Sequence, residues 1–217
     1  MSEPLYLSRL ELNLRQPDAA RELFDPVALH HRLMAAFPAG GGRADQQLLF
    51  RVDAAVRPFV LVQSRRAPVW ESLPGGYLSD GGLHVRRMDA QLDALGCGTA
   101  LRFRLLANPV RAAVTEERRR GRRTPLRERE ELLAWITRLA ERAGFVPVGS
   151  LSTEVLQPVR GVRIKNGKRY PLTLHRVLFD GVLLISDPVQ FSASVRTGLG
   201  FGKAYGFGLL SLAHGGE

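Results

Sequence analysis

Cysteine is almost absent from this chain, because Cys97 is the only one in 217 residues. A single thiol excludes an internal disulfide and a zinc site built on cysteines. No apolar stretch approaches the roughly 20 residues that span a bilayer. The first residues, Met-Ser-Glu-Pro-Leu-Tyr-Leu, contain neither the basic segment nor the apolar core of a signal peptide. We therefore expect a cytoplasmic protein that makes no membrane contact.

Negative charge is also scarce, since 21 Asp and Glu face 31 Lys and Arg, which gives a net charge of +10 and a pI near 10.9. Such a balance is typical of proteins that bind polyanions. Lysine is rare too, so the positive charge is mostly arginine, and an arginine excess can also reflect genomic base composition. The placement of the charges is more informative. They gather in two runs, at Arg118, Arg119, Arg120, Arg122 and Arg123, and at Arg160, Arg163, Lys165, Lys168 and Arg169.

The sequence lacks the residue sets of metal-dependent nucleases: it has no His-Asp doublet, no clustered Asp and Glu of the kind that holds two metal ions, and no Cys/His ligand set. The acids at Glu128, Glu130 and Glu131 lie among arginines on an expected helix, where surface ion pairs are the ordinary role. We expect no metal and no cofactor. RNA needs none for cleavage, because its 2′-hydroxyl is a built-in nucleophile. A base, an acid and cations near the phosphate are sufficient.

Glycine is concentrated in one place, the run Gly-Leu-Gly-Phe-Gly-Lys-Ala-Tyr-Gly-Phe-Gly at residues 198–208, which we call the glycine loop. Glycine permits positive φ and lets a ligand approach backbone N–H groups closely, and Lys203 favours an anionic ligand. The run fits neither a Walker A loop nor a dinucleotide fingerprint. We interpret it as a phosphate-binding loop for nucleic acid, with Gly200, Gly202 and Lys203 as contacts. The alternative is a purely structural turn.

The first half of the chain predicts a strand at 5–14, a helix at 19–37 and a strand pair at 48–52 and 59–63. Asp25 is an expected N-cap, and Pro26 should begin a new helical turn. The stretch 68–95 reads as irregular, with turn signals at Pro74-Gly75-Gly76 and Asp80-Gly81-Gly82.

The second half predicts a strand at 101–105, a helix capped by Thr124-Pro125 and closed by Gly144, and two long strands joined at Asn166-Gly167. A further hairpin at Asp180-Gly181, a helix at 188–196 and a strand at 207–212 complete it. Strand, helix, two strands, helix, strand is the ferredoxin-like order. The sequence thus predicts an α+β protein with two tandem ferredoxin-like (βαββαβ) domains, residues 1–95 and 96–217, with the second clearer than the first.

Histidine suits either proton-transfer role in RNA cleavage, because its unperturbed pKa is about 6.5. His84, His175 and His214 stand alone, whereas His30 and His31 are adjacent in the first helix. Neighbouring helical residues diverge by about 100°, so only one of the two can face a given groove. The ordinary alternative is that a helical histidine only fills surface or core.

Three segments are similar to those of a known family: Phe-Asp-Pro-Val-Ala-Leu-His at 24–30, Leu-Arg-Phe-Arg-Leu-Leu-Ala-Asn-Pro at 101–109, and the glycine loop with the Leu-Leu-Ser-Leu that follows it. Through them the chain resembles the CRISPR-repeat endoribonucleases of the type I-E system, the CasE family of the RAMP group. The resemblance also includes the expected helix that begins at Thr124-Pro125 and the segment Val-Leu-Phe-Asp-Gly at 177–181. The Asn-Pro strand together with the glycine loop is specific, whereas the histidine helix alone is not.

The resemblance implies metal-independent cleavage of precursor CRISPR RNA at the repeat hairpin, leaving a 2′,3′-cyclic phosphate and a 5′-hydroxyl. It implies that the protein stays on its product as a Cascade subunit, and we expect a monomer when it is free. The family's catalytic histidine, four residues after the proline, is His30. Some members have a tyrosine where this chain has Val27, so the second proton-transfer group stays open among His31, Lys203, Tyr205 and water.

For the RNA hairpin we expect contacts from His31, from Arg119, Arg120, Arg122 and Arg123 in the first basic run, and from Arg160, Arg163 and Lys165 in the second. A single basic run is ordinarily a solvated face, so this expectation depends on the two runs and the glycine loop acting together. Two alternatives to the enzyme remain. One is a non-catalytic RNA-binding scaffold subunit of a CRISPR complex, and the other is a basic protein associated with ribosomes or tRNA.

Overall fold

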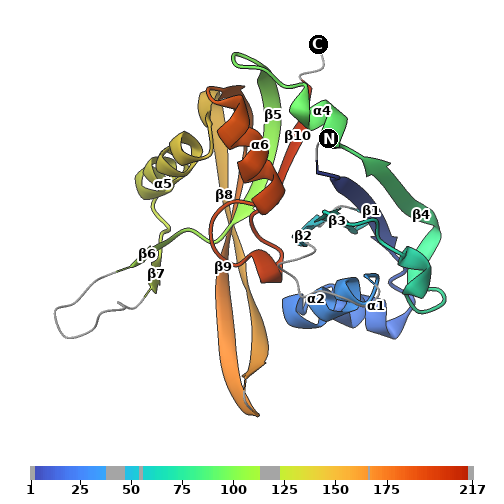
Figure 1. Cartoon of the computed structure of the whole chain (residues 1–217). Coiled ribbons are helices and arrows are strands. Elements are labelled where there is room, and N and C mark those ends of the chain that lie inside the picture. Colours follow the sequence, from blue (N-terminus) through green and yellow to red (C-terminus); the bar gives the residue numbers. More distant parts are fainter. Residues whose placement is uncertain (1–2, 38–46, 54–55, 113–122, 166, 215–217) are drawn as a thin grey trace.

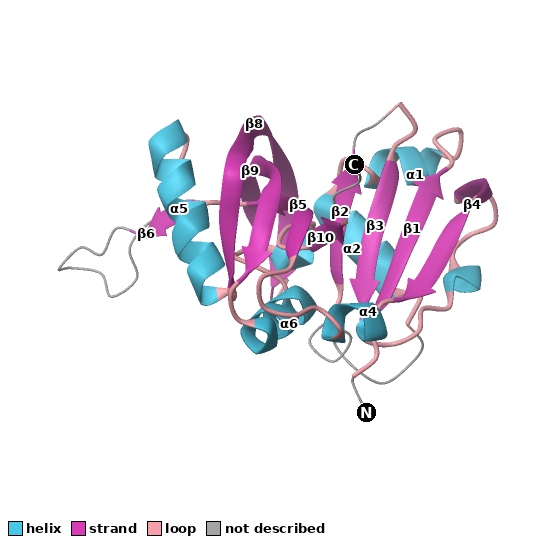
Figure 2. Ribbon diagram, turned by 90° about the horizontal axis from the view of Figure 1, so that it is seen from above, coloured by secondary structure: helices cyan, strands magenta, loops and turns pink. Residues whose placement is uncertain are grey.

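Two four-stranded antiparallel sheets lie side by side in the computed structural model, which describes residues 3–37, 47–53, 56–112, 123–165 and 167–214. The first sheet has the strand order β2-β3-β1-β4 and the second the order β10-β5-β9-β8. Both are the 4-1-3-2 order of a ferredoxin-like sheet, so the α+β, tandem ferredoxin-like prediction is confirmed. Figure 2 shows α5 along the outer face of the second sheet.

The first sheet and its helices come from the first half of the chain. In chain order the elements are β1 (Tyr6–Leu12), α1 (Pro17–Glu22), α2 (Pro26–Met34), β2 (Leu49–Asp53), β3 (Phe59–Ser64), the 3-10 turn η1 (Trp70–Ser72), β4 (Leu78–Arg87) and α4 (Asp89–Asp93). A buried cluster including Leu10, Leu29, Leu33 and Phe50 joins this sheet to α1 and α2. Where a ferredoxin-like domain has its second helix, between β3 and β4, the chain forms only η1.

The second half gives a complete strand-helix-strand-strand-helix-strand unit with one added hairpin. Its elements are β5 (Ala100–Ala107), β6 (Val110–Ala112), β7 (Arg123–Pro125), α5 (Arg129–Arg142), β8 (Phe145–Lys165), β9 (Lys168–Ile185), α6 (Pro188–Thr197), the 3-10 turn η2 (Lys203–Tyr205) and β10 (Leu210–Ala213). Leu101, Phe103 and Leu105 alternate with exposed arginines in β5 and pack under α5 and α6. The hairpin of β8 and β9 projects well past the sheet (Figure 1).

Two predictions for the first half were wrong. The single helix at 19–37 is two helices, because Pro26 has no N–H to continue α1 and Asp25, in an extended conformation, caps α2 instead. The stretch 68–95 contains the ten-residue strand β4 and the helix α4. The supposed turn at Asp80-Gly81-Gly82 lies inside β4, where the register with β1 shifts between Leu10 and Leu12 and Gly81 takes φ +67°. The glycines mark a bulge and not a chain reversal.

Two predictions for the second half were also wrong. Thr124-Pro125 does not cap a helix: both residues belong to β7, and α5 begins at Arg129 after Glu128. Asp180-Gly181 is not a hairpin, because β9 runs without a break to Ile185. A small residue fits there, because a Cβ would lie 3.0 Å from Leu151 Cδ1, a tight contact. The pairing of Lys165 with Lys168 confirms that the two long strands form a hairpin, while Asn166 itself lies outside the described residues.

Buried polar contacts fix the two sheets relative to each other. Arg51 of β2 pairs with Asp53 at 2.9 Å and donates to the carbonyl of Arg104 and to Ser211 Oγ, both in the second sheet. Gln63 of β3 donates from Nε2 to the carbonyls of Val195 and Arg196 at 2.9 and 3.2 Å. These contacts join β2 and β3 of the first sheet to β5, β10 and α6. The division at residues 95–96 stays a prediction.

Candidate functional site

The histidine helix α2 begins at a complete N-terminal cap. Asp25 Oδ1 accepts hydrogen bonds from the backbone N–H groups of Val27 and Ala28, at 2.9 and 3.1 Å, and Pro26 occupies the first helical position. This is the cap predicted from the sequence. It fixes where the nine-residue helix starts and therefore which way each of its two histidines faces.

The two histidines occupy different environments. His30 is half-buried, with its Nδ1 beneath the surface, and its ring stacks on Phe50 of β2, with centroids 6.3 Å apart and ring planes 19° apart. His31 is exposed, with its ring 6.0 Å from that of His30. Phe50 is 1% exposed and belongs to the core of the first sheet. A ring seated on a fixed core residue has a defined orientation, as a proton-transfer group requires.

A buried carboxylate anchors α2 to the first domain. Glu22 of α1 receives two hydrogen bonds from the Arg32 guanidinium, at 2.9 and 2.7 Å, and one from the Tyr77 hydroxyl at 2.8 Å. Burial alone would raise the pKa of Glu22, but the hydrogen bonds from Arg32 and Tyr77 outweigh it and lower that pKa. Arg32 lies two residues after His30, so this network holds the helix on which the histidine is presented.

The glycine loop packs directly against the first domain, beside the histidine helix. The turn η2, which contains Lys203 and Tyr205, lies next to both α2 and β2. Gly206 has φ +86°, and a Cβ there would be 3.1 Å from Phe50, the ring on which His30 stacks. Gly198 has φ +76°, and a Cβ there would be 2.7 Å from Leu49. Residues some 170 positions apart are thus brought together at His30.

Much of the glycine loop's chemistry is used to shape the loop itself. All five of its glycines have positive φ. Leu199 N–H donates to the Gly208 carbonyl, Gly208 N–H to the Leu106 carbonyl and Tyr205 N–H to the Gly202 carbonyl, at 2.8 to 2.9 Å. Lys203 Nζ donates to the Thr197 carbonyl at 2.8 Å and so closes the loop. The structural interpretation therefore accounts for several of these residues, and phosphate binding by Gly200, Gly202 and Lys203 stays a prediction.

The hairpin of β8 and β9 reaches the other end of α2. A Cβ on Gly161 of β8 would lie 3.1 Å from Val27 Cγ2 and 4.0 Å from Pro26 Cγ, so the helix start rests on the hairpin (Figure 1). Arg160 precedes this contact, is exposed and pairs in register with Thr173. Arg163 and Lys165 lie further along the same strand toward its tip. The arm predicted to contact RNA therefore begins at the histidine helix.

The first basic run lies mostly outside the described residues. This holds for Arg119, Arg120 and Arg122, whereas the backbone of Arg123 begins β7. The strands β6 and β7 that flank this segment are paired, since Val110 lies opposite Pro125. Among the residues that the structure describes, no three or more His, Cys, Asp or Glu side chains are grouped so as to hold a metal ion. No helix in this described part is long and apolar enough to cross a membrane.

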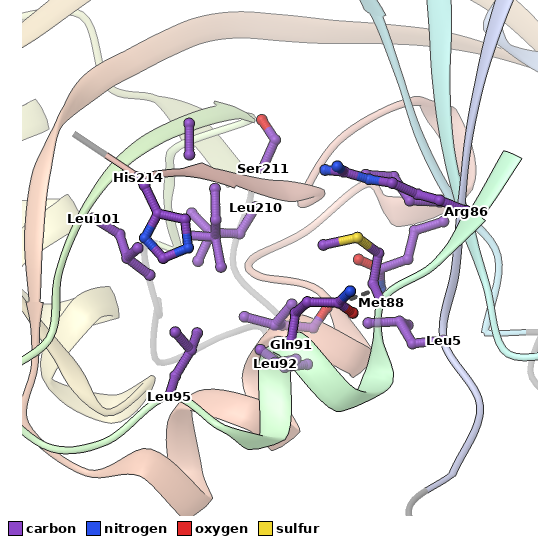
Figure 3. Close-up of a pocket in the computed structure, with 15 residues that line it drawn as sticks. Leu5, Arg86, Met88, Gln91, Leu92, Leu95, Leu101, Leu210, Ser211 and His214 are labelled. Atoms are coloured by element: carbon purple, nitrogen blue, oxygen red, sulfur yellow. Dashed lines mark hydrogen bonds between the residues drawn. The ribbon is translucent and has the colours of Figure 1, made fainter. Parts of the chain in front are cut away.

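A pocket of about 380 Å³ between the domains contains none of the predicted site residues (Figure 3). Its wall is mostly apolar, with Arg86 and Gln91 on one side and His214 on the other. It opens at the far end of the interface from α2, beside α4 and β10. His30 is therefore not part of this pocket.

Sequence reasoning missed the residues that support His30. Phe50 reads as an ordinary strand hydrophobe, and Glu22 and Tyr77 are 55 residues apart. Asp25-Pro26 did locate the helix start in the sequence. His30 could therefore be placed on that helix, whereas the residues that hold it in position could not be identified. A strand register for β2 would have been needed to place Phe50 under the imidazole.

Comparisons with known proteins agree with this arrangement. The model of a family described as CRISPR associated protein matches residues 5–214. The CRISPR-associated endoribonuclease Cse3 of Thermus thermophilus is 35% identical over 96% of this chain and all of its own. The CRISPR system Cascade subunit CasE of Escherichia coli is 31% identical over 87% of this chain and 92% of its own.

Among solved structures, Thermus thermophilus Cse3 bound to an RNA representing a pre-cleavage complex superposes with a TM-score of 0.80. It is 31% identical, and the match covers 97% of this chain and 99% of that one. The similarity thus extends over both domains, including the histidine helix and the glycine loop. The chain belongs to the family of CRISPR-associated proteins that includes the endoribonuclease Cse3 and the Cascade subunit CasE.

Proposed function

We propose that this protein is a metal-independent endoribonuclease that cleaves precursor CRISPR RNA at its repeat hairpins. The observation that supports this most is the position of His30, a titratable ring held on Phe50 where α2 meets the glycine loop. The relatives add the substrate class, since Cse3 is named an endoribonuclease and has been solved with RNA.

The proposed reaction is an internal transesterification. The 2′-oxygen attacks the adjacent phosphorus and loses its proton to a base, while the bond from phosphorus to the 5′-oxygen breaks and that oxygen gains a proton from an acid. The products are a 2′,3′-cyclic phosphate and a 5′-hydroxyl. Histidine can perform either proton transfer near neutral pH. His30 performs one of the two, and the other group is His31, Lys203, Tyr205 or a water.

Cationic side chains hold the substrate in this proposal. Arg160, Arg163 and Lys165 of the β8–β9 hairpin and the arginines at 119, 120, 122 and 123 contact phosphates of the RNA stem, because duplex RNA is read largely through shape and backbone. Gly200, Gly202 and Lys203 contact the strand near the cut. The protein stays on its product as a subunit of Cascade, the complex of which CasE is named a subunit. A subunit that processes the cell's own transcripts is cytoplasmic.

The test is incubation of the purified protein with the repeat RNA encoded beside its gene, in excess EDTA. We expect cleavage at one position, with an upstream product that resists 3′-end labelling until its cyclic phosphate has been opened and the resulting phosphate removed. A 3′-hydroxyl and 5′-phosphate at the cut, or a requirement for added Mg²⁺, would contradict the proposed chemistry. Tight binding without cleavage would identify the scaffold subunit instead.

A further inference from the structure

A second groove, of about 370 Å³, lies between the first domain and the open face of the second sheet. Helix α2 contributes Pro26 and Leu29 to its wall, and the glycine loop contributes Tyr205 and Gly206. The rest of the wall is mostly apolar. The groove therefore touches both elements that meet at His30, and its volume is within the range of small-molecule sites.

One cation stands out in this apolar wall, Arg176 of β9. It lies on the same face of the strand as Leu174 and Leu178, opposite Leu156 of β8. Its side chain is half-buried, and among the residues that the structure describes no carboxylate lies within 4.0 Å of the guanidinium and no group accepts a hydrogen bond from it. The other buried arginines differ, since Arg32 and Arg51 both pair with carboxylates.

Within the described part of the chain, no partner compensates the burial of this charge. Desolvation lowers the pKa of Arg176, and no neighbouring charge opposes that effect. An unpaired charge that is taken out of water destabilises a fold, and proteins ordinarily satisfy it with a partner. A guanidinium binds phosphate through two parallel hydrogen bonds, as it does a carboxylate, so the phosphate of a nucleotide is a well-fitting anionic ligand for it.

The groove also has an aromatic side chain on which an RNA nucleobase could stack. Phe24, in the link between α1 and α2, lines it and is 78% exposed, so its ring is accessible to a ligand in the groove. Unpaired RNA bases stack on exposed aromatic rings of this kind. An inorganic anion would use the guanidinium alone, whereas a nucleotide uses both Arg176 and Phe24.

We propose that this groove binds one unpaired nucleotide of the RNA, with its phosphate on the Arg176 guanidinium and its base against Phe24. The inference depends on the proposed function, because it places the single strand next to the hairpin duplex that the β8–β9 arm contacts. It adds a site that positions the strand passing His30. Arg176 is a positioning residue here and does not touch the reacting atoms.

Thermal unfolding with inorganic phosphate separates a binding role from a structural one. We expect Arg176→Met to unfold at a higher temperature than the wild type in phosphate-free buffer, because an uncompensated charge has been removed. Added phosphate should stabilise the wild type by mass action and the variant less. Arg138→Met, which removes an exposed arginine from α5, should behave like the wild type. A lower unfolding temperature for Arg176→Met with an unchanged phosphate response would mean that Arg176 is structural.

Binding of a short single-stranded RNA supplies the second readout. We expect Arg176→Met to weaken it about 10-fold or more, the size of a hydrogen-bonded charge contact, and to reduce the salt slope by about 0.7. The RNA affinity of Arg176→Lys should lie between those of the wild type and Arg176→Met, because lysine keeps the charge but cannot form the two parallel hydrogen bonds of a guanidinium. Phe24→Ala should weaken binding at an unchanged salt slope. If Arg176→Met binds the RNA with the same affinity and the same salt slope as the wild type, the proposed site is wrong.

Cleavage of the repeat hairpin by the same variants keeps this inference distinct from the proposed function. A wild type that cleaves the repeat while Arg176→Met leaves single-strand binding unchanged overturns the groove site alone. A wild type that never cleaves, yet whose single-strand binding depends on Arg176 and Phe24, supports the groove site and contradicts the nuclease.

Discussion

Replacing His30 with alanine will slow cleavage of repeat RNA by about 10²- to 10⁴-fold, the range expected when a general acid or base is lost. Binding of the RNA hairpin will be nearly unchanged, because the imidazole stacks on Phe50 and contributes little of the basic surface. Single-turnover cleavage rates and binding isotherms on the same preparation measure the two effects separately.

His31→Ala is the matched control for that experiment. His31 is exposed on the same helix, one residue on, and its loss should reduce RNA affinity more than the cleavage rate. If His31→Ala slows cleavage more than His30→Ala does, then the exposed imidazole is the catalytic one. The half-buried ring on Phe50 would in that case be a core residue.

The largest expected effect on stability comes from Glu22. Its carboxylate is 5% exposed and is the shared acceptor for Arg32 and Tyr77. Glu22→Gln leaves the Arg32 guanidinium without its main partner in a mostly buried setting, which should cost about 3 kcal/mol in the free energy of unfolding. Chemical denaturation measures this. Because Arg32 is in α2, the cleavage rate should fall as the helix loosens.

The pH dependence of the same variant follows from the sign of the pKa shift. The pKa of Glu22 is lower in the folded protein than in the unfolded chain, so its contribution is full above the unfolded value of about 4.5. That contribution is lost as the pH falls through the folded value. Wild-type stability should therefore decline below about pH 4.5, and Glu22→Gln should decline less.

Asp18→Asn is the control for Glu22→Gln. Asp18 also faces Arg32, at 3.7 Å, but its side chain is 42% exposed, so its ion pairs are screened by water. We expect a loss of about 0–1 kcal/mol from Asp18→Asn. Equal losses from the two variants would mean that the buried hydrogen bonds of Glu22 add nothing beyond a surface charge.

The sequence was most informative where one local signal determines the backbone. Asp25-Pro26 located the start of α2, Asn166-Gly167 located the β8–β9 turn, and alternation in β5 located its buried face. Glycine led to wrong turn predictions where tertiary contacts, and not a chain reversal, explain its presence. Gly81 sits in a bulge and Gly181 lies under Leu151, and both read as turns because a single sequence does not show what packs above a glycine.

The site could be predicted only in part for a related reason. His30 was identified through the resemblance and the helix that presents it, whereas the ring beneath it belongs to β2 and the loop beside it to the far end of the chain. The meeting of η2 with α2 depends on how two separately folded sheets pack, which no local pattern encodes. Arg176 was missed because an arginine in an amphipathic strand reads as a solvent-facing residue.

The central claim is that the RNA supplies its own nucleophile and that His30 assists it. A repeat RNA with a single 2′-deoxy substitution at the nucleotide whose 2′-oxygen would attack tests this most directly. We predict that the protein binds this RNA as tightly as the unmodified repeat and does not cleave it, with EDTA present throughout. Cleavage of the deoxy substrate at the normal position and rate would contradict 2′-oxygen attack, and with it the role assigned to His30.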